Sequence, residues 1–104
     1  MSRSHHAHFR VESDHPALAG HFPGNPVVPG VLLLDHVLVA AEAWLVRELR
    51  PAQLPQVKFV SPLLPGEDAT ITLEAADQVV RFRVECAQRL LAQGQFSLDE
   101  PGAA

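Results

Sequence analysis

An apolar segment at residues 27–46 constrains the fold of this chain more than any other feature. The segment is long enough to cross a lipid bilayer. However, it contains Asp35, His36 and Glu42, and each ionisable side chain of this kind costs about 2–3 kcal/mol or more at membrane depth. We therefore predict a helix that is buried within the protein, and no membrane span.

The same segment carries a signal for the start of the helix. Pro29-Gly30 stands near its beginning, and proline is tolerated there because the first N–H groups of a helix lack intrahelical partners. We predict that the helix begins at Pro29-Gly30 and ends at residues 48–49, before Pro51. Asp35 and Glu42 fall on nearly the same face, while most of the remaining circumference is apolar. A helix of this kind is expected at the centre of the protein.

Several other segments alternate apolar and polar residues, which is typical of β-strands with one buried face. These expected strands lie at residues 7–11, 57–59, 69–75, 80–86 and 90–98. Alternation with one polar face indicates an antiparallel sheet that is solvated on one side. The sheet can bury its apolar face by wrapping the helix. We therefore predict an α+β fold, one strand, a helix and four strands, in a single domain over residues 1–104 with a frayed tail from about residue 99.

Composition bounds the partners of the chain. Its 104 residues are 47% hydrophobic and 19% charged, although a domain of this size buries only about 60–65% of its unfolded surface. We expect part of the apolar excess to cover a second copy of the chain. The net charge is −4 with only eight Lys and Arg residues, which argues against nucleic-acid binding.

Cysteine content and the N-terminal residues bear on the compartment. Cys86 is the one cysteine, so a disulfide framework or a cysteine zinc site is not expected. Residues 1–20 contain histidines, acids and prolines where a secretory signal is apolar. A cytoplasmic location is the expectation.

The chemistry concentrates in residues 20–35, where His21 stands in a Pro/Gly-rich loop and Asp35 follows on the predicted helix. This segment offers a base, an acid and a helix start. Those are the parts that proton abstraction next to a carbonyl requires.

Six groups of residues resemble the β-hydroxyacyl-acyl-carrier-protein dehydratases. They are Gly20-His21-Phe22, Gly24-Asn25-Pro26-Val27, Pro29-Gly30, Leu34-Asp35, Lys58-Phe59 and Leu64-Pro65-Gly66-Glu67. Members of that family have the hotdog fold, a curled antiparallel sheet around a central helix. The resemblance therefore implies the same architecture that the residue patterns predict.

The resemblance also implies roles for three residues. His21, in its neutral form, would take the proton from the carbon next to the thioester. Asp35 would protonate the departing β-hydroxyl, directly or by holding a water. The Gly30 backbone N–H would polarise the thioester carbonyl. The acyl group would arrive on the phosphopantetheine arm of an acyl carrier protein or of coenzyme A, with no cofactor and no metal. In the family, the histidine and the carboxylate of one site come from different subunits, which implies a homodimer or a dimer-based oligomer.

Substrate contacts are implied at Phe22, Pro29, Val31 and Val39. Position 39 departs from the family, in which a glutamine usually stands one helical turn after the carboxylate. An aspartate in place of glutamate marks the family's branch that also isomerises its product, but we do not assign isomerase activity to Asp35 on this residue alone.

Two alternatives remain open: a thioesterase on the same fold, and a non-catalytic acyl-binding or partner subunit. A carrier protein is acidic, so its binding would need a local basic patch, for which Arg47, Arg50 and Lys58 are candidates. We interpret His36 as structural. The N-terminal histidines are interpreted as a solvated terminus, because no third ligand is placed beside them for a metal.

Overall fold

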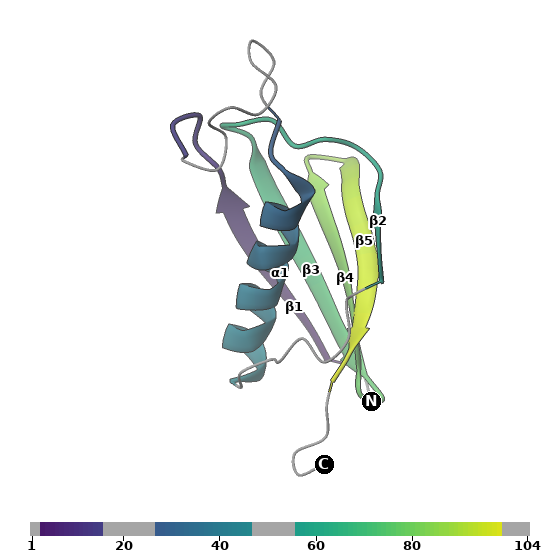
Figure 1. Ribbon diagram of the computed structural model, residues 1–104. Coiled ribbons are helices and arrows are strands. Elements are labelled where there is room, and N and C mark those ends of the chain that lie inside the picture. The colour runs from purple at the N-terminus through teal and green to yellow at the C-terminus, as the bar shows by residue number, and fades with distance from the viewer. Residues whose placement is uncertain (1–2, 16–26, 47–55, 99–104) are drawn as a thin grey trace.

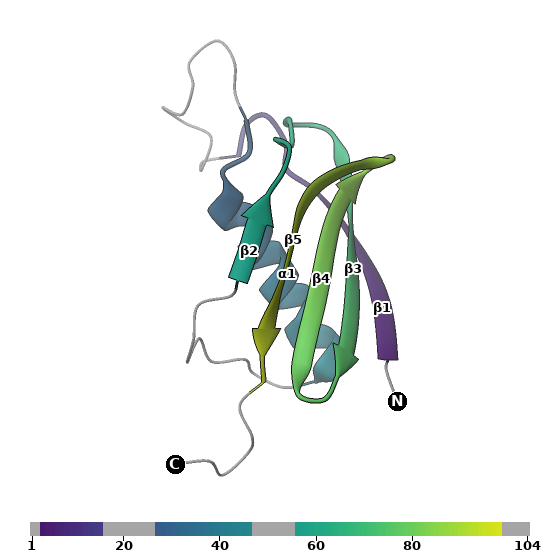
Figure 2. The ribbon, with the colours of Figure 1, turned by 90° about the vertical axis from the view of Figure 1, so that its right-hand side faces the viewer.

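The computed structural model describes residues 3–15, 27–46 and 56–98 (Figure 1). Its elements, in chain order, are β1 (Arg3–Arg10), α1 (Gly30–Leu45), β2 (Gln56–Phe59), β3 (Asp68–Ala76), β4 (Val79–Cys86) and β5 (Arg89–Ser97). The five strands form one antiparallel sheet in the order β1-β3-β4-β5-β2. The α1 helix lies against one face of this twisted sheet, as Figures 1 and 2 show from two directions. The predicted α+β architecture is confirmed.

The core lies between α1 and the inner face of the sheet. On α1, the buried residues are Leu33, Val37 and Ala41, spaced four apart so that they form one stripe along the helix. On the sheet, alternate residues of β3 and β4 point inward, as their sequence period predicts. Each fully buried Leu, Val or Phe side chain contributes about 1.5–3 kcal/mol. The apolar stripe and the apolar sheet face therefore account for the way α1 seats on the sheet.

The end of α1 differs from the prediction. The helix ends at Leu45, not at residues 48–49, because Val46 adopts left-handed backbone angles (φ 54°, ψ 47°). Its N–H donates to the Glu42 carbonyl and caps the helix. A β-branched residue in this conformation is unusual, so the sequence pattern did not indicate the stop.

The hairpin between β3 and β4 turns at Asp77-Gln78, where both residues have positive φ (52° and 65°). Two consecutive residues of this kind are typical of the type I′ turn that joins tightly paired strands. In the described part of the chain, no helix is long and apolar enough to cross a membrane.

Candidate active site at the start of the helix

The start of α1 is held from the neighbouring loop. The N–H of Val28 donates to the carbonyl of Leu63 over 2.8 Å, and Val28 itself is buried. Pro29 then occupies the N-cap position with extended backbone angles and provides no side-chain cap. The first turn also contains no acidic residue. The positive end of the helix, which begins at Gly30, is therefore not neutralised by a side chain of its own first turn.

Phe59, at the end of β2, lies directly over Gly30. A Cβ atom added to Gly30 would lie 2.7 Å from Phe59 Cε1 and 2.8 Å from Cζ, so only glycine leaves room for the ring. The ring stays 50% exposed. Phe59 therefore covers one side of the first turn and presents its other side to solvent.

A pocket of about 540 Å³ opens beside this contact. Among the described residues, Ser61 is the one lining residue with a polar side chain, and backbone groups also reach the surface of the pocket. The lining residues come from the start of α1, from the end of β2 and from the chain that follows it: Val28, Gly30, Val31, Leu33, Phe59, Val60, Ser61, Pro62 and Leu63. The positive end of a helix beside an apolar pocket suits a ligand that carries a polarisable carbonyl on a hydrocarbon chain.

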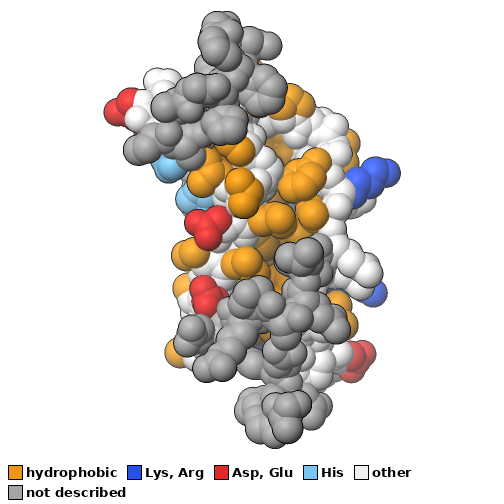
Figure 3. All heavy atoms as spheres, in the orientation of Figure 1, with side chains coloured by type: hydrophobic (Ala, Val, Ile, Leu, Met, Phe, Trp, Pro, Cys, Tyr) orange, Lys and Arg blue, Asp and Glu red, His pale blue; other side chains and the backbone are white. Residues whose placement is uncertain are grey.

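Asp35 lies one turn further along α1, on the side away from the sheet. Its side chain is exposed. Val31, one turn before it, is 72% exposed, and Val39, one turn after it, is 56% exposed. Figure 3 shows hydrophobic side chains along α1 and beside it on this face of the molecule. The helix is thus buried on one side only, and its predicted central position is correct only for the stripe that faces the sheet.

His36 points toward β1 instead. Its ring stacks on Phe9 with a centroid distance of 4.2 Å and an interplanar angle of 10°. Burial lowers the pKa of His36, opposed by the nearby charge of Asp35. The contact fits the structural interpretation of this histidine.

The structure places some of the predicted site residues and not others. Gly30, Pro29 and Val31 lie together at the first turn of α1, with Asp35 and Val39 following on its exposed side. His21 and Phe22, and likewise Arg47 and Arg50, lie outside the described residues.

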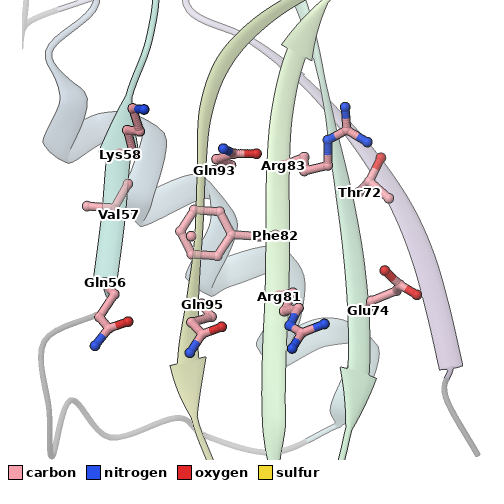
Figure 4. Close-up of a pocket in the computed structure, with 11 residues that line it drawn as sticks. Gln56, Val57, Lys58, Thr72, Glu74, Arg81, Phe82, Arg83, Gln93 and Gln95 are labelled. Atoms are coloured by element: carbon pink, nitrogen blue, oxygen red, sulfur yellow. The ribbon is translucent and has the colours of Figure 1, made fainter.

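A second groove, of about 530 Å³, lies on the opposite face of the sheet. In Figure 4 the strands stand in front of the helix, and polar side chains of four strands line the groove. They include Lys58, Arg81, Arg83 and Glu74. Lys58 is therefore separated by the sheet from the Gly30 pocket. This groove belongs to the solvated face that the alternation of polar residues predicts.

Sequence reasoning missed two contributions to the site, the Phe59 ring and the Leu63 carbonyl. Lys58-Phe59 was part of the family resemblance, but that resemblance assigned the phenylalanine no role. A signal was present in the pairing of a glycine at the helix start with an aromatic residue at a strand end, although only the fold shows that the two meet.

Comparisons with known proteins agree with this architecture. The family model for the ApeI-like dehydratases matches residues 1–95. A dehydratase from Thermus thermophilus, the 3-hydroxyacyl-[acyl-carrier-protein] dehydratase FabZ, is 35% identical over 94 residues, which cover 82% of this chain and 65% of the relative. The FabZ protein of Haemophilus influenzae is 31% identical over 72 residues, which cover 62% of this chain and 49% of the relative. The chain thus spans between half and two thirds of the length of these curated relatives.

Solved structures show the same fold. The dehydratase heterocomplex ApeI:P from Xenorhabdus doucetiae contains a chain that is 25% identical with a TM-score of 0.76, covering 93% of this chain and 88% of that one. A 1,4-dihydroxy-2-naphthoyl-CoA thioesterase from Synechocystis, 18% identical with a TM-score of 0.66, covers 89% of this chain and 78% of its own and shares the fold alone. The predicted hotdog fold is confirmed, and the match over residues 1–95 shows that the chain belongs to the ApeI-like dehydratases, within the β-hydroxyacyl-acyl-carrier-protein dehydratase family.

Proposed function

We propose that the protein removes water from a β-hydroxyacyl thioester and forms the trans-2-enoyl thioester. The observation that carries this proposal is the start of α1, where a helix end without a side-chain cap opens beside an apolar pocket, one turn before the exposed carboxylate of Asp35. The acyl group would be carried by phosphopantetheine on an acyl carrier protein, as the names of the FabZ relatives suggest, or on coenzyme A.

In the proposed reaction, the Gly30 N–H donates a hydrogen bond to the carbonyl oxygen of the thioester. The positive end of α1 stabilises the negative charge that develops on that oxygen, and this makes the adjacent C–H more acidic. Neutral His21 takes the proton from this carbon, while Asp35 protonates the departing β-hydroxyl, directly or through a water that it holds. The C–H and C–O bonds break, the C=C bond forms and water leaves. Electrons stay within the substrate, so the step needs no redox cofactor.

We infer that a second hotdog subunit completes the site. Val31 and Val39 flank Asp35 on the exposed side of α1, and the short strand β2 stands at the sheet edge. A partner on this side would cover the exposed apolar groups and could bring its own His21 to Asp35. The partner is a second copy of this chain in the simplest assembly. The ApeI:P structure is described as a heterocomplex, so a different hotdog chain is the second possibility.

The remaining substrate contacts follow from the same placement. Val31 lines the pocket, Pro29 precedes Gly30 at the N-cap position, and Val39 lies one turn beyond Asp35. We propose that an acyl chain or its carrier arm passes these residues, with Phe22 as a further contact. We also propose a reducing compartment such as the cytoplasm, because Cys86 is a buried free thiol.

The test is incubation of the purified protein with a β-hydroxyacyl pantetheine thioester, followed by mass spectrometry of the products. We expect an enoyl thioester, lost in His21→Ala and in Asp35→Asn. Glu42→Gln, which changes another carboxylate of the same helix, serves as the control and should retain activity. Release of a free thiol would instead identify a thioesterase. Acyl binding without turnover would identify a partner subunit.

A further inference from the structure

Three segments meet at the carboxylate of Glu67. Its Oε1 accepts hydrogen bonds from the Leu64 N–H at 2.9 Å and from Arg89 Nη2 at 2.8 Å. Its Oε2 lies 3.6 Å from the Cys86 thiol, which donates to it. The carboxylate therefore ties the loop before β3 to the end of β4 and to the start of β5.

The loop that Glu67 holds, residues 60–66, is fixed along its length. The N–H groups of Val60 and Ser61 both donate to the Leu91 carbonyl, at 2.8 and 3.2 Å. Arg89 Nη2 also donates to the carbonyl of Pro62 at 3.3 Å. The Gly66 N–H donates to the carbonyl oxygen of Val11 at 2.8 Å. The loop is thus bonded to β5 at one end and to the chain after β1 at the other.

This loop supports the start of α1. Leu63, in its middle, is fully buried, and its carbonyl accepts the bond from Val28, two residues before Gly30. Ser61, Pro62 and Leu63 also form one wall of the apolar pocket. Any shift of the loop therefore moves both the pocket wall and the anchor of the helix start.

We propose that Glu67 is a positioning residue that fixes the Gly30 amide through the loop at residues 60–66 and the Val28–Leu63 hydrogen bond. This inference rests on the proposed function, because the amide matters for catalysis only if it binds the thioester carbonyl. Without the carboxylate, the Leu64 N–H and Arg89 lose their shared acceptor, and the loop loses its bond to β5 at this point. A displacement of about 1 Å in a catalytic group can cost about 10²-fold in rate.

The pKa of Glu67 is lowered, first by the hydrogen bond from the Leu64 backbone and then by the one from Arg89. The carboxylate is therefore held in its ionised form, as the network needs. The thiol of Cys86 has a raised pKa, mainly because it is buried. The protonated thiol is thus the donor in its contact with Glu67, and it adds a third hydrogen bond to the carboxylate.

The experiment compares Glu67→Ala and Glu67→Gln with Glu85→Gln. Glu85 is the matched control, since its carboxylate has a similar exposure (30% against 28%) and also lies near an arginine, Arg83, at 3.9 Å. Three quantities are measured for each variant: backbone hydrogen exchange at Val28, kcat and KM for the β-hydroxyacyl thioester, and thermal unfolding.

We expect Glu67→Ala to speed exchange at Val28 and to lower kcat by about 10- to 100-fold, with KM within about threefold of wild type. Glu67→Gln keeps an acceptor for Leu64 and should fall between Glu67→Ala and wild type, and it serves as the test if the alanine variant does not fold. Glu85→Gln should match wild type. Lower thermal stability with unchanged Val28 exchange, or faster Val28 exchange with unchanged kcat, overturns the proposal. If the wild-type protein makes no enoyl product, the proposed function fails separately, and Val28 exchange alone decides whether Glu67 positions the helix start.

Discussion

Replacing Gly30 by alanine tests whether Phe59 explains the glycine at the helix start. The added Cβ would lie 2.7 Å from Cε1, 2.8 Å from Cζ and 3.3 Å from Cδ1 of the ring. Gly30 does not have the positive φ that is found at Gly66, so its backbone angles allow alanine. The cost of the substitution must therefore come from the ring.

The magnitude follows from what the ring can do. Overpacking in a closed core costs about 1–3 kcal/mol. The Phe59 ring, however, is 50% exposed and can turn toward solvent, for which an off-rotamer side chain costs about 0.5–1.5 kcal/mol. Alanine also gains up to about 0.5–1 kcal/mol over glycine in a helix. The net loss of stability should be no more than about 1 kcal/mol, which is a shift of about 4–8 °C in Tm for a domain of this size. The larger effect should fall on activity, because the displaced ring moves at the pocket and at the amide.

The assay is a double-mutant cycle of Gly30→Ala and Phe59→Ala, read by urea unfolding and by enoyl formation. Phe59→Ala makes room for the new methyl group, so Gly30→Ala should be less harmful in that background, with a coupling of about 0.5–1.5 kcal/mol. Gly66→Ala is the control, since Gly66 has a φ of +85° and no neighbour within 4 Å of an added Cβ. Its cost should come from the backbone and be the same with or without Phe59. If Gly30→Ala and Phe59→Ala are additive within about 0.3–0.5 kcal/mol, the steric explanation for Gly30 is wrong.

Four further outcomes are expected. Val39→Asp places a charge on the exposed apolar side of α1. It should shift the protein toward monomers in sedimentation and lower its activity in proportion to the dimer that is lost. Because the pKa of Glu67 is lowered, its ionised carboxylate stabilises the fold in full above the ordinary glutamate pKa of 4.5. This stabilisation is lost as pH falls through the lower pKa of the folded state. The urea midpoint of Glu67→Gln should therefore fall less steeply with acid than that of wild type. Burial lowers the pKa of His36, so the neutral ring stabilises the fold above pH 6.5, and this stabilisation is lost as pH falls through the pKa of the folded state. NMR titration should find the pKa of His36 below 6.5. A higher pKa would contradict the burial of the ring. The buried thiol of Cys86, with its raised pKa, should react with thiol reagents at pH 8 only as fast as the protein unfolds, whereas rapid labelling of the native protein would contradict this placement.

Much of the fold could be predicted from the sequence because the patterns are local. The alternation at residues 69–75 and 80–86 places β3 and β4 within two residues of their observed ends. Pro29-Gly30 marks the start of α1 correctly. The C-terminal end of the helix was missed because Val46 takes a conformation for which glycine is the usual signal.

The site was predictable only in part, because its contacts join distant segments. Gly30 and Asp35 came from one short motif, but the approach of Phe59 depends on where β2 pairs with β5. In that pairing Phe59 lies opposite Ala92 and Val57 opposite Gly94. A Cβ on Gly94 would meet the Gln56 carbonyl at 2.0 Å, so β2 approaches closely only because this position of β5 lacks a side chain. No periodicity in the sequence encodes that approach.

These contacts give a physical reason for the two parts of the family resemblance that follow the helix in the chain. Lys58-Phe59 ends β2 with the ring that covers the helix start, and residues 64–67 supply both Glu67 and the Leu64 N–H that bonds to it. Both segments stand more than 25 residues after Gly30 in the chain, yet each reaches the first turn of α1, one directly and one through Leu63 and Val28. The segment at residues 20–35 therefore does not define the site by itself. The edge strand β2 and the loop after it contact the first turn of α1 and hold its anchor at Val28. In the proposed assembly, a second subunit would enclose Asp35 on the exposed side of the helix.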